Sequence, residues 1–189
     1  MRYKLYLLML ITPLLPGCMT AVSSSASAVY NRYNLENTYN NQMLAWQAQQ
    51  NINHNTQLKY ETNINATSFD KMILLTGQAP TENLREQAEN AAKEVPNAKH
   101  VIDMVQITEP VSSFQQMQDS WLTTKVASQI ITSGATDPDN VKVVTENNTV
   151  YLMGSLKRAQ AQQVIDIAKN TDGVEKVVTL IYFLDPKTS

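Results

Sequence analysis

The chain has 189 residues, of which 43% are hydrophobic, and a net charge of −2. Without residues 1–17, 13 of the 15 basic residues and all 17 acidic residues remain, which is a side-chain charge of −4. That balance provides no basic surface for nucleic acid, so we expect no nucleic-acid partner. The length fits one ordinary domain or two very small ones.

The N-terminus predicts export. Arg2 and Lys4 form a basic start, and the apolar run over residues 5–15 is too short to span a bilayer. Residues 1–17 are therefore predicted to be a secretory signal peptide. Cys18 is the only cysteine, so it has no internal disulfide partner. A lone cysteine at the cleavage site resembles the lipobox of bacterial lipoproteins, in which Cys18 would become an acylated, palmitate-bearing first residue.

The alternative is an ordinary signal peptide followed by a chance cysteine. Free cysteine is scarce in exported chains, which favours the lipobox. By resemblance to the sorting pattern of such lipoproteins, Met19 in place of Asp favours the periplasmic face of the outer membrane. Residues 18–42, rich in Ser, Asn and Tyr, are predicted to be a lipidated N-terminus and flexible tether. No later stretch approaches the ~18 apolar residues of a membrane span.

An internal repeat divides the rest of the chain. The aligned pairs of segments are 63–77 with 140–154, 85–93 with 161–169, and 100–105 with 176–181. We therefore predict two copies of one unit, at residues 43–109 and 119–185, joined by a linker at 110–118.

Each copy reads as helix, strand, strand, helix, strand. Alternating apolar residues, a short polar turn and an apolar β-prone run predict a hairpin in each copy. Gly77 and Gly154 are expected to mark the point where the chain leaves the sheet, and Thr81 is a plausible N-cap of the following helix. The predicted fold class is α+β, with two tandem αββαβ domains, each a three-stranded mixed sheet against two helices. The other face of each sheet must stay wet or pack on the other copy.

These units resemble a known family. Two αββαβ units, each with an apolar-x-apolar-x-Gly strand end and following a lipobox, are similar to the BON-domain proteins, in particular the dual-BON outer-membrane lipoproteins. The likeness extends to Phe183 and is strongest in residues 120–133 and 140–154. It implies binding of anionic phospholipid through the first helix of the second copy. It also implies support of outer-membrane integrity, a link to cell division, and contact with the barrel-assembly machinery.

The first helix of the second copy has two distinct faces. At about 100° per residue, Leu122, Val126 and Ile130 form one stripe that faces the sheet, whereas Trp121 and Ile131 lie on the opposite side. The predicted lipid-binding residues share this outer face or its margin; they are Trp121, Thr124, Lys125, Ser128 and Ile131.

The angles also allow a second interpretation, in which Trp121 and Ile131 pack on the first copy or on the linker residues Phe114 and Met117. In the first copy, Leu44, Ala48 and Ile52 form a sparse stripe in a helix predicted at about residues 42–54. Trp46 lies opposite that stripe, where it is either a second membrane contact or a residue that packs against the second copy; packing is the favoured prediction.

The sequence disfavours an enzyme. His54 and His100 have no carboxylate or cysteine patterned around them, and no Gly-rich phosphate loop is present. The segment 137–140 lacks the glycine and terminal glutamate of a calcium loop, so it is interpreted as a turn. We therefore predict no catalytic residue, no metal and no cofactor. A periplasmic interaction adaptor or chaperone-like module without lipid preference is the alternative function, and it predicts a buried Trp121.

Overall fold

The structure, a computed structural model, describes residues 25–184, with side chains from Thr38 onward. The predicted signal peptide, Cys18 and the first residues of the predicted tether lie outside the described residues. The first copy contains α1 (Ser25–His54), α2 (Thr56–Glu61), β1 (Asn63–Phe69), β2 (Met72–Ala79), α3 (Glu82–Lys93), β3 (His100–Asp103) and β4 (Gln106–Ile107). The second contains α4 (Ser113–Ser133), the 3₁₀ turn η1 (Pro138–Asn140), β5 (Val141–Glu146), β6 (Thr149–Leu156), α5 (Arg158–Lys169) and β7 (Lys176–Phe183).

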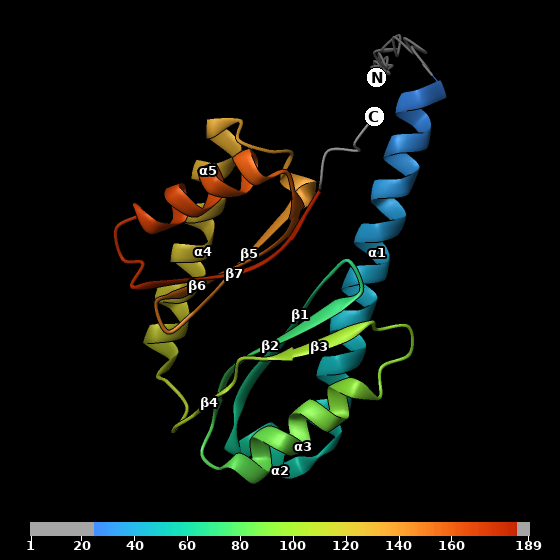
Figure 1. Cartoon of the computed structure of the whole chain (residues 1–189). Coiled ribbons are helices and arrows are strands. Elements are labelled where there is room, and N and C mark those ends of the chain that lie inside the picture. Colours follow the sequence, from blue (N-terminus) through green and yellow to red (C-terminus); the bar gives the residue numbers. More distant parts are fainter. Residues whose placement is uncertain (1–24, 185–189) are drawn as a thin grey trace, which may run out of the picture.

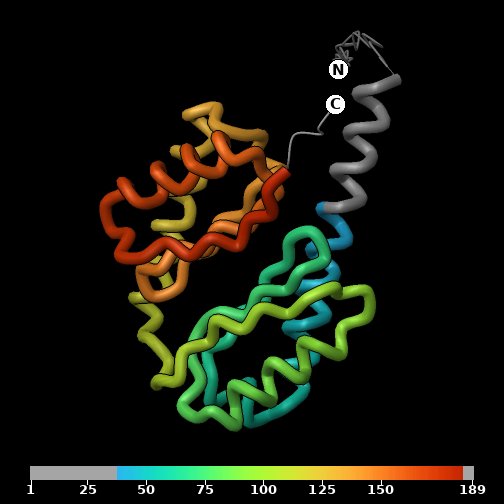
Figure 2. The backbone as a smooth tube through the Cα atoms, viewed as in Figure 1, coloured from blue at the N-terminus to red at the C-terminus, as the bar shows by residue number. Residues whose placement is uncertain are grey.

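Both copies have the same mixed sheet, and the predicted fold class is confirmed (Figures 1 and 2). In the first copy β2 pairs antiparallel with β1 and parallel with β3 and β4, which follow each other along one edge. In the second copy β6 pairs antiparallel with β5 and parallel with β7. Two-residue turns with positive φ at both positions close the hairpins, as the twist of antiparallel strands favours. These turn residues are Asp70, Lys71, Asn147 and Asn148.

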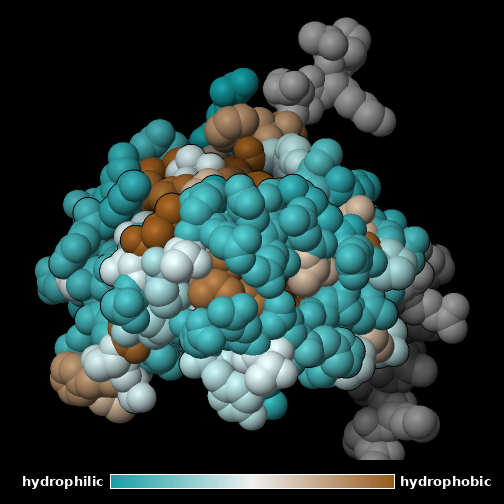
Figure 3. Space-filling model, turned by 90° about the horizontal axis from the view of Figure 1, so that it is seen from below, coloured by the Kyte–Doolittle hydropathy of each residue, from teal (hydrophilic) through white to brown (hydrophobic). Residues whose placement is uncertain are grey.

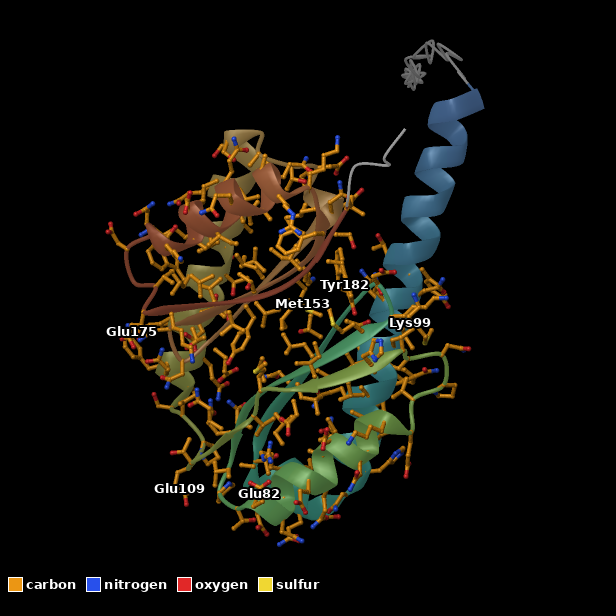
Figure 4. All side chains as sticks on the ribbon, viewed as in Figure 1. Glu82, Lys99, Glu109, Met153, Glu175 and Tyr182 are labelled. Atoms are coloured by element: carbon orange, nitrogen blue, oxygen red, sulfur yellow. The ribbon has the colours of Figure 1, made fainter. Side chains whose placement is uncertain are left out.

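The two sheets face each other, and the helices cover their outer sides (Figure 1). Met72 and Leu74 of β2 meet Tyr151 and Met153 of β6 in one buried apolar cluster, and the Met153 side chain lies between the sheets in Figure 4. Of the two arrangements that the sequence allowed for the inner sheet faces, the structure therefore has packing on the other copy. Each sheet also forms a separate core with its own helices.

The residues of all three cores lie between Leu44 and Ile181. A chain that starts at Met19 therefore retains every core residue found among residues 25–184. Among residues 25–184, no helix has the length and apolarity needed to cross a bilayer.

A polar network closes one end of the contact between the sheets. Gln78 is fully buried, and its Nε2 donates to Oε1 of Glu146 at 2.6 Å. Its Oε1 accepts from Nδ2 of Asn63 at 2.9 Å and from the Val111 N–H at 3.2 Å. Burial raises the pKa of the Glu146 carboxyl above its usual value, and the hydrogen bond from Gln78 opposes that rise. One side chain thus ties together β1, the interdomain segment and the second domain.

Two stretches predicted to be a flexible tether and a linker are helical instead. Helix α1 begins at Ser25, so residues 25–42 of the predicted tether are helical. Helix α4 begins at Ser113, so residues 113–118 of the predicted linker are helical as well. Neither stretch contains the Gly or Pro that would interrupt a helix. In the second, Ser112 supplies an N-cap by accepting from the Gln115 N–H at 3.2 Å.

Three further expectations need correction. Trp46 is 59% exposed and does not pack on the second copy, because the domains meet through their sheets and leave the outer side of α1 uncovered. Gly77 and Gly154 lie inside β2 and β6 and do not mark the end of the strand. Gly77 has φ +116°, and a Cβ there would lie 1.8 Å from the Asn63 carbonyl oxygen. The glycine therefore permits a close approach of β1.

Candidate functional site

Helix α4 is held to the second sheet by the stripe that the sequence predicted. Leu122, Val126 and Ile130 are all buried in the core of the second domain. The helix ends at Gly134, whose left-handed φ of 66° suits a C-terminal glycine. The stripe fixes which face of α4 points away from the protein, so the outer face is a consequence of core packing.

Asp119 fixes the N-terminal half of α4. Its side chain is buried, and its two carboxylate oxygens accept from the N–H groups of Asn147 and Asn148 at 2.8 and 2.9 Å. Gln115 donates to Oδ1 at 3.2 Å. The carboxylate thereby binds the β5–β6 turn to the helix, a contact that no local pattern predicts because its partners lie 28 and 29 residues further along the chain.

The outer face of α4 carries four large apolar side chains in the open. Trp121 is 62% exposed and Ile131 is 55% exposed. Phe114 and Met117 are equally open, at 62% and 61%. Trp121 and Ile131 therefore do not pack on the first copy or on the linker, which was the second interpretation. The lipid-binding role of these residues stays a prediction.

These side chains lie on one line along the helix. The positions 114, 117, 121, 124, 128 and 131 advance alternately by three and four residues, which is the spacing of one helical face. We call this face the outer stripe; its members are Phe114, Met117, Trp121, Thr124, Ser128 and Ile131. Over 18 residues it extends for about 25 Å at 1.5 Å per residue. Phe114 and Met117 were missed as members because residues 110–118 were assigned to a linker. The Ser112 cap was the signal that could have extended the helix backward.

One of the two hydroxyl groups of the outer stripe is hydrogen-bonded within the helix. The Thr124 hydroxyl donates to the Ser120 carbonyl oxygen at 3.0 Å, so its proton already has an acceptor within the helix. Ser128 is exposed between Thr124 and Ile131. No acidic or basic side chain belongs to the stripe.

Lys125 borders the outer stripe, as predicted from its angle. Its ammonium lies 5.0 Å from the centre of the Trp121 ring and donates to the Asp172 carbonyl oxygen at 3.0 Å. The fully exposed Asp172 carboxylate is 4.0 Å away. An ammonium has three donors, so donors remain for an anion at the margin of the stripe.

A hollow of about 450 Å³ lies beside Trp121, between α4 and the segment that leads into β7. Leu122, Asn148 and Gly173 contribute to its lining. The face seen from below is largely hydrophilic, with hydrophobic side chains in separate groups (Figure 3). Helix α4 thus presents an exposed apolar line next to a hollow.

Comparisons with known proteins agree with this architecture. The model of the BON domain matches residues 42–109 and 118–183. The chain is 31% identical to the Outer membrane lipoprotein DolP of Haemophilus influenzae over 96% of each chain. It is 34% identical to the 21 kDa hemolysin of Actinobacillus pleuropneumoniae, over 71% of this chain and 69% of that protein. Neither name denotes an enzyme.

Among solved structures, the C-terminal domain of CdsD, a structural protein of the type III secretion system of Chlamydia trachomatis, is similar at a TM-score of 0.31. That similarity covers 76% of this chain and 67% of the CdsD chain, with 16% identity. The overlap is too low to bear on fold or function.

Proposed function

The chain belongs to the BON-domain family and is an outer-membrane lipoprotein, and on that premise we propose that it binds anionic phospholipid through the outer stripe of α4. Cys18 supplies the lipid anchor in this proposal, and the protein supports the integrity of the outer membrane from its periplasmic face. The observation that carries the proposal is the exposure of four large apolar side chains along one face of a helix whose core contacts do not use them.

The free energy gained by inserting the exposed apolar side chains determines whether the binding is reversible. Full burial of a large apolar side chain contributes about 1.5–3 kcal/mol, so a side chain that is about 60% exposed can gain roughly 1–2 kcal/mol on insertion. Four such side chains suffice for a reversible contact. A lipid anchor keeps the helix near the bilayer at high effective concentration. In this proposal the anchor provides attachment, and α4 selects the lipid.

The preference for anionic lipid rests on Lys125 and on the resemblance to the family. One basic side chain near an anionic surface contributes about 1 kcal/mol, which is enough to bias the choice of headgroup. Lys125 also lies over Trp121, at the depth where an indole sits in a bilayer interface. Contact with the barrel-assembly machinery stays a prediction of the resemblance.

The test uses residues 19–189 carrying Trp46→Phe, so that Trp121 is the only tryptophan. We expect long-wavelength emission in buffer, because the ring is exposed, and a blue shift on titration with phosphatidylglycerol vesicles. Phosphatidylcholine vesicles should give little shift, and salt should weaken the response. Ile131→Glu and Phe114→Glu, at opposite ends of the stripe, should each abolish it.

Ile107→Glu is the matched control, because Ile107 has the same 55% exposure as Ile131 but lies on β4 of the first domain. It should leave the titration unchanged. No shift with either vesicle would overturn the proposal and favour the adaptor function. Equal loss in Ile107→Glu and Ile131→Glu would show that the outer stripe has no special role.

A further inference from the structure

The edges of the two sheets differ in how far they are protected from pairing with a further strand. In the first domain a side chain occupies the free edge of β1. Gln49 of α1 accepts from the Ala66 N–H through Oε1 at 2.9 Å and donates to the Ile64 carbonyl oxygen through Nε2 at 3.0 Å. The glutamine thereby makes the hydrogen bonds that an added strand would make. That edge is closed to a further strand.

The opposite edge of the first sheet is closed by a carboxylate. Oδ1 of Asp103 accepts from the Val105 N–H at 2.9 Å, and Oδ2 accepts from Arg85 at 2.8 Å. At this point the edge strand is interrupted between β3 and β4. Inward charge and interruption are the devices by which proteins protect a sheet edge from unwanted pairing.

In the second domain β7 has neither device. The repeat places Thr179 where the first copy has Asp103, and β7 runs for eight uninterrupted residues with no charged side chain after Lys176. Glu175 and Tyr182 mark its two ends in Figure 4. Within the described part of the chain, β7 pairs with β6 alone. Its other edge pairs with no strand among residues 25–184.

One hydrogen bond shows which backbone N–H and C=O groups of β7 point away from β6. The Leu184 N–H donates to the Leu156 carbonyl oxygen of β6 at 2.9 Å. Because backbone groups alternate along a strand, the even-numbered residues of β7 face β6 and the odd-numbered ones face outward. The alternation begins after Glu175, whose N–H also donates inward, to the Asn148 carbonyl oxygen at 3.0 Å. Four residues therefore present N–H and C=O groups at the free edge; they are Val177, Thr179, Ile181 and Phe183.

We propose that this free edge binds the β7 edge of a second copy of the chain in antiparallel register. With Val177 opposite Phe183 and Thr179 opposite Ile181, all four outward residues of each copy find partners, and within residues 176–184 no two charged residues oppose each other. Such pairing is self-complementary, as a two-fold interface requires. It joins two three-stranded sheets into one of six strands.

The two-fold symmetry of this pairing is compatible with binding of both copies to one membrane. A two-fold axis through an antiparallel strand pair is perpendicular to the sheet, so α4 of both copies lies on the same side. Both outer stripes then face one surface. Strand pairing alone buries little area compared with a stable dimer, so the contact is weak in solution. Anchoring in a membrane raises the effective concentration of the second copy.

The experiment uses the full-length lipoprotein in membranes. Thr179→Cys places two thiols on diagonally neighbouring positions of the paired strands, about 7–8 Å apart, within reach of a short bismaleimide. Cys18 is the only native cysteine, and the chain without an added thiol controls for it. We expect a cross-linked product of twice the chain mass, confirmed by mass spectrometry as two copies.

The matched control is Gln106→Cys, an exposed position on the protected edge of the first domain, which should cross-link several-fold less. Phe183→Pro in the Thr179→Cys background removes one outward N–H and should lower the yield, while circular dichroism verifies the fold. Equal yields from Thr179→Cys and Gln106→Cys would overturn the proposal. So would a product that contains a different protein, because the edge would then bind a foreign strand. The vesicle titration of Trp121 fluorescence tests the lipid proposal independently of this cross-linking experiment.

Discussion

Besides the apolar cluster between the sheets, one buried glutamine links the two domains by hydrogen bonds, which makes Gln78→Leu an informative perturbation of the fold. The substitution keeps the approximate volume and removes three hydrogen bonds, to Glu146, Asn63 and the Val111 N–H. A hydrogen bond to a charged group contributes about 1.5–3 kcal/mol and an ordinary one about 1 kcal/mol. We therefore expect the free energy of unfolding to fall by roughly 3–5 kcal/mol.

The assay is urea unfolding of residues 19–189 at pH 7, followed by circular dichroism and by tryptophan fluorescence. Trp46 and Trp121 lie in different domains. Unfolding transitions that no longer coincide between circular dichroism and fluorescence would therefore also reveal that the two domains unfold separately. Gln106→Leu is the control, because Gln106 is exposed and surface substitutions change stability by no more than about 0.5 kcal/mol. A loss below about 1 kcal/mol in Gln78→Leu would refute the reasoning, since the three bonds would then contribute little net free energy.

Three other substitutions test separate parts of the structure. Burial raises the pKa of Glu146, so the folded state holds its proton more tightly and this stabilisation is lost as pH rises through the folded pKa. Glu146→Gln should therefore raise the melting temperature at pH 7, with a gain that shrinks toward acid pH; a constant gain would contradict the linkage. Gly77→Ala should destabilise far more than Gly134→Ala in thermal melts, because a Cβ at Gly134 meets nothing within 4 Å. Asp119→Ala should cost about 2–4 kcal/mol and speed amide exchange at Asn147 and Asn148; unchanged exchange would contradict the assigned hydrogen bonds.

The structural features that could be predicted from the sequence are those that depend on local patterns and on the internal repeat. The 3.6-residue spacing of Leu122, Val126 and Ile130 identified the buried stripe of α4, and the internal repeat identified both sheets. Thr81 is the N-cap of α3, as predicted, and accepts from the Leu84 N–H at 3.3 Å. Each of these features depends on residues close together in the chain, where one physical rule decides the outcome.

The docking of the domains could not be predicted in the same way. Leu74 and Tyr151 lie in strands that are buried on both faces, and such strands read as continuous apolar runs. That pattern indicates a covered inner face without saying what covers it. The Gln78–Glu146 hydrogen bond joins residues 68 positions apart, and no local pattern marks either of them as a partner. Trp46 was assigned to the interface for lack of this information.

The two copies show how one scaffold can present two different surfaces. Leu44, Ala48 and Ile52 bury α1 as Leu122, Val126 and Ile130 bury α4, so the same positions face the sheet in both. Spaced 78 residues apart, Asn53 in α1 then corresponds to Ile131 in α4. Because docking covers the inner faces of both sheets, the outer helix faces and the sheet edges stay accessible. An apolar outer face of α4 and an unprotected edge of β7 both occur in the second domain, so our two proposals, for lipid and for a second copy, concern the same half of the molecule.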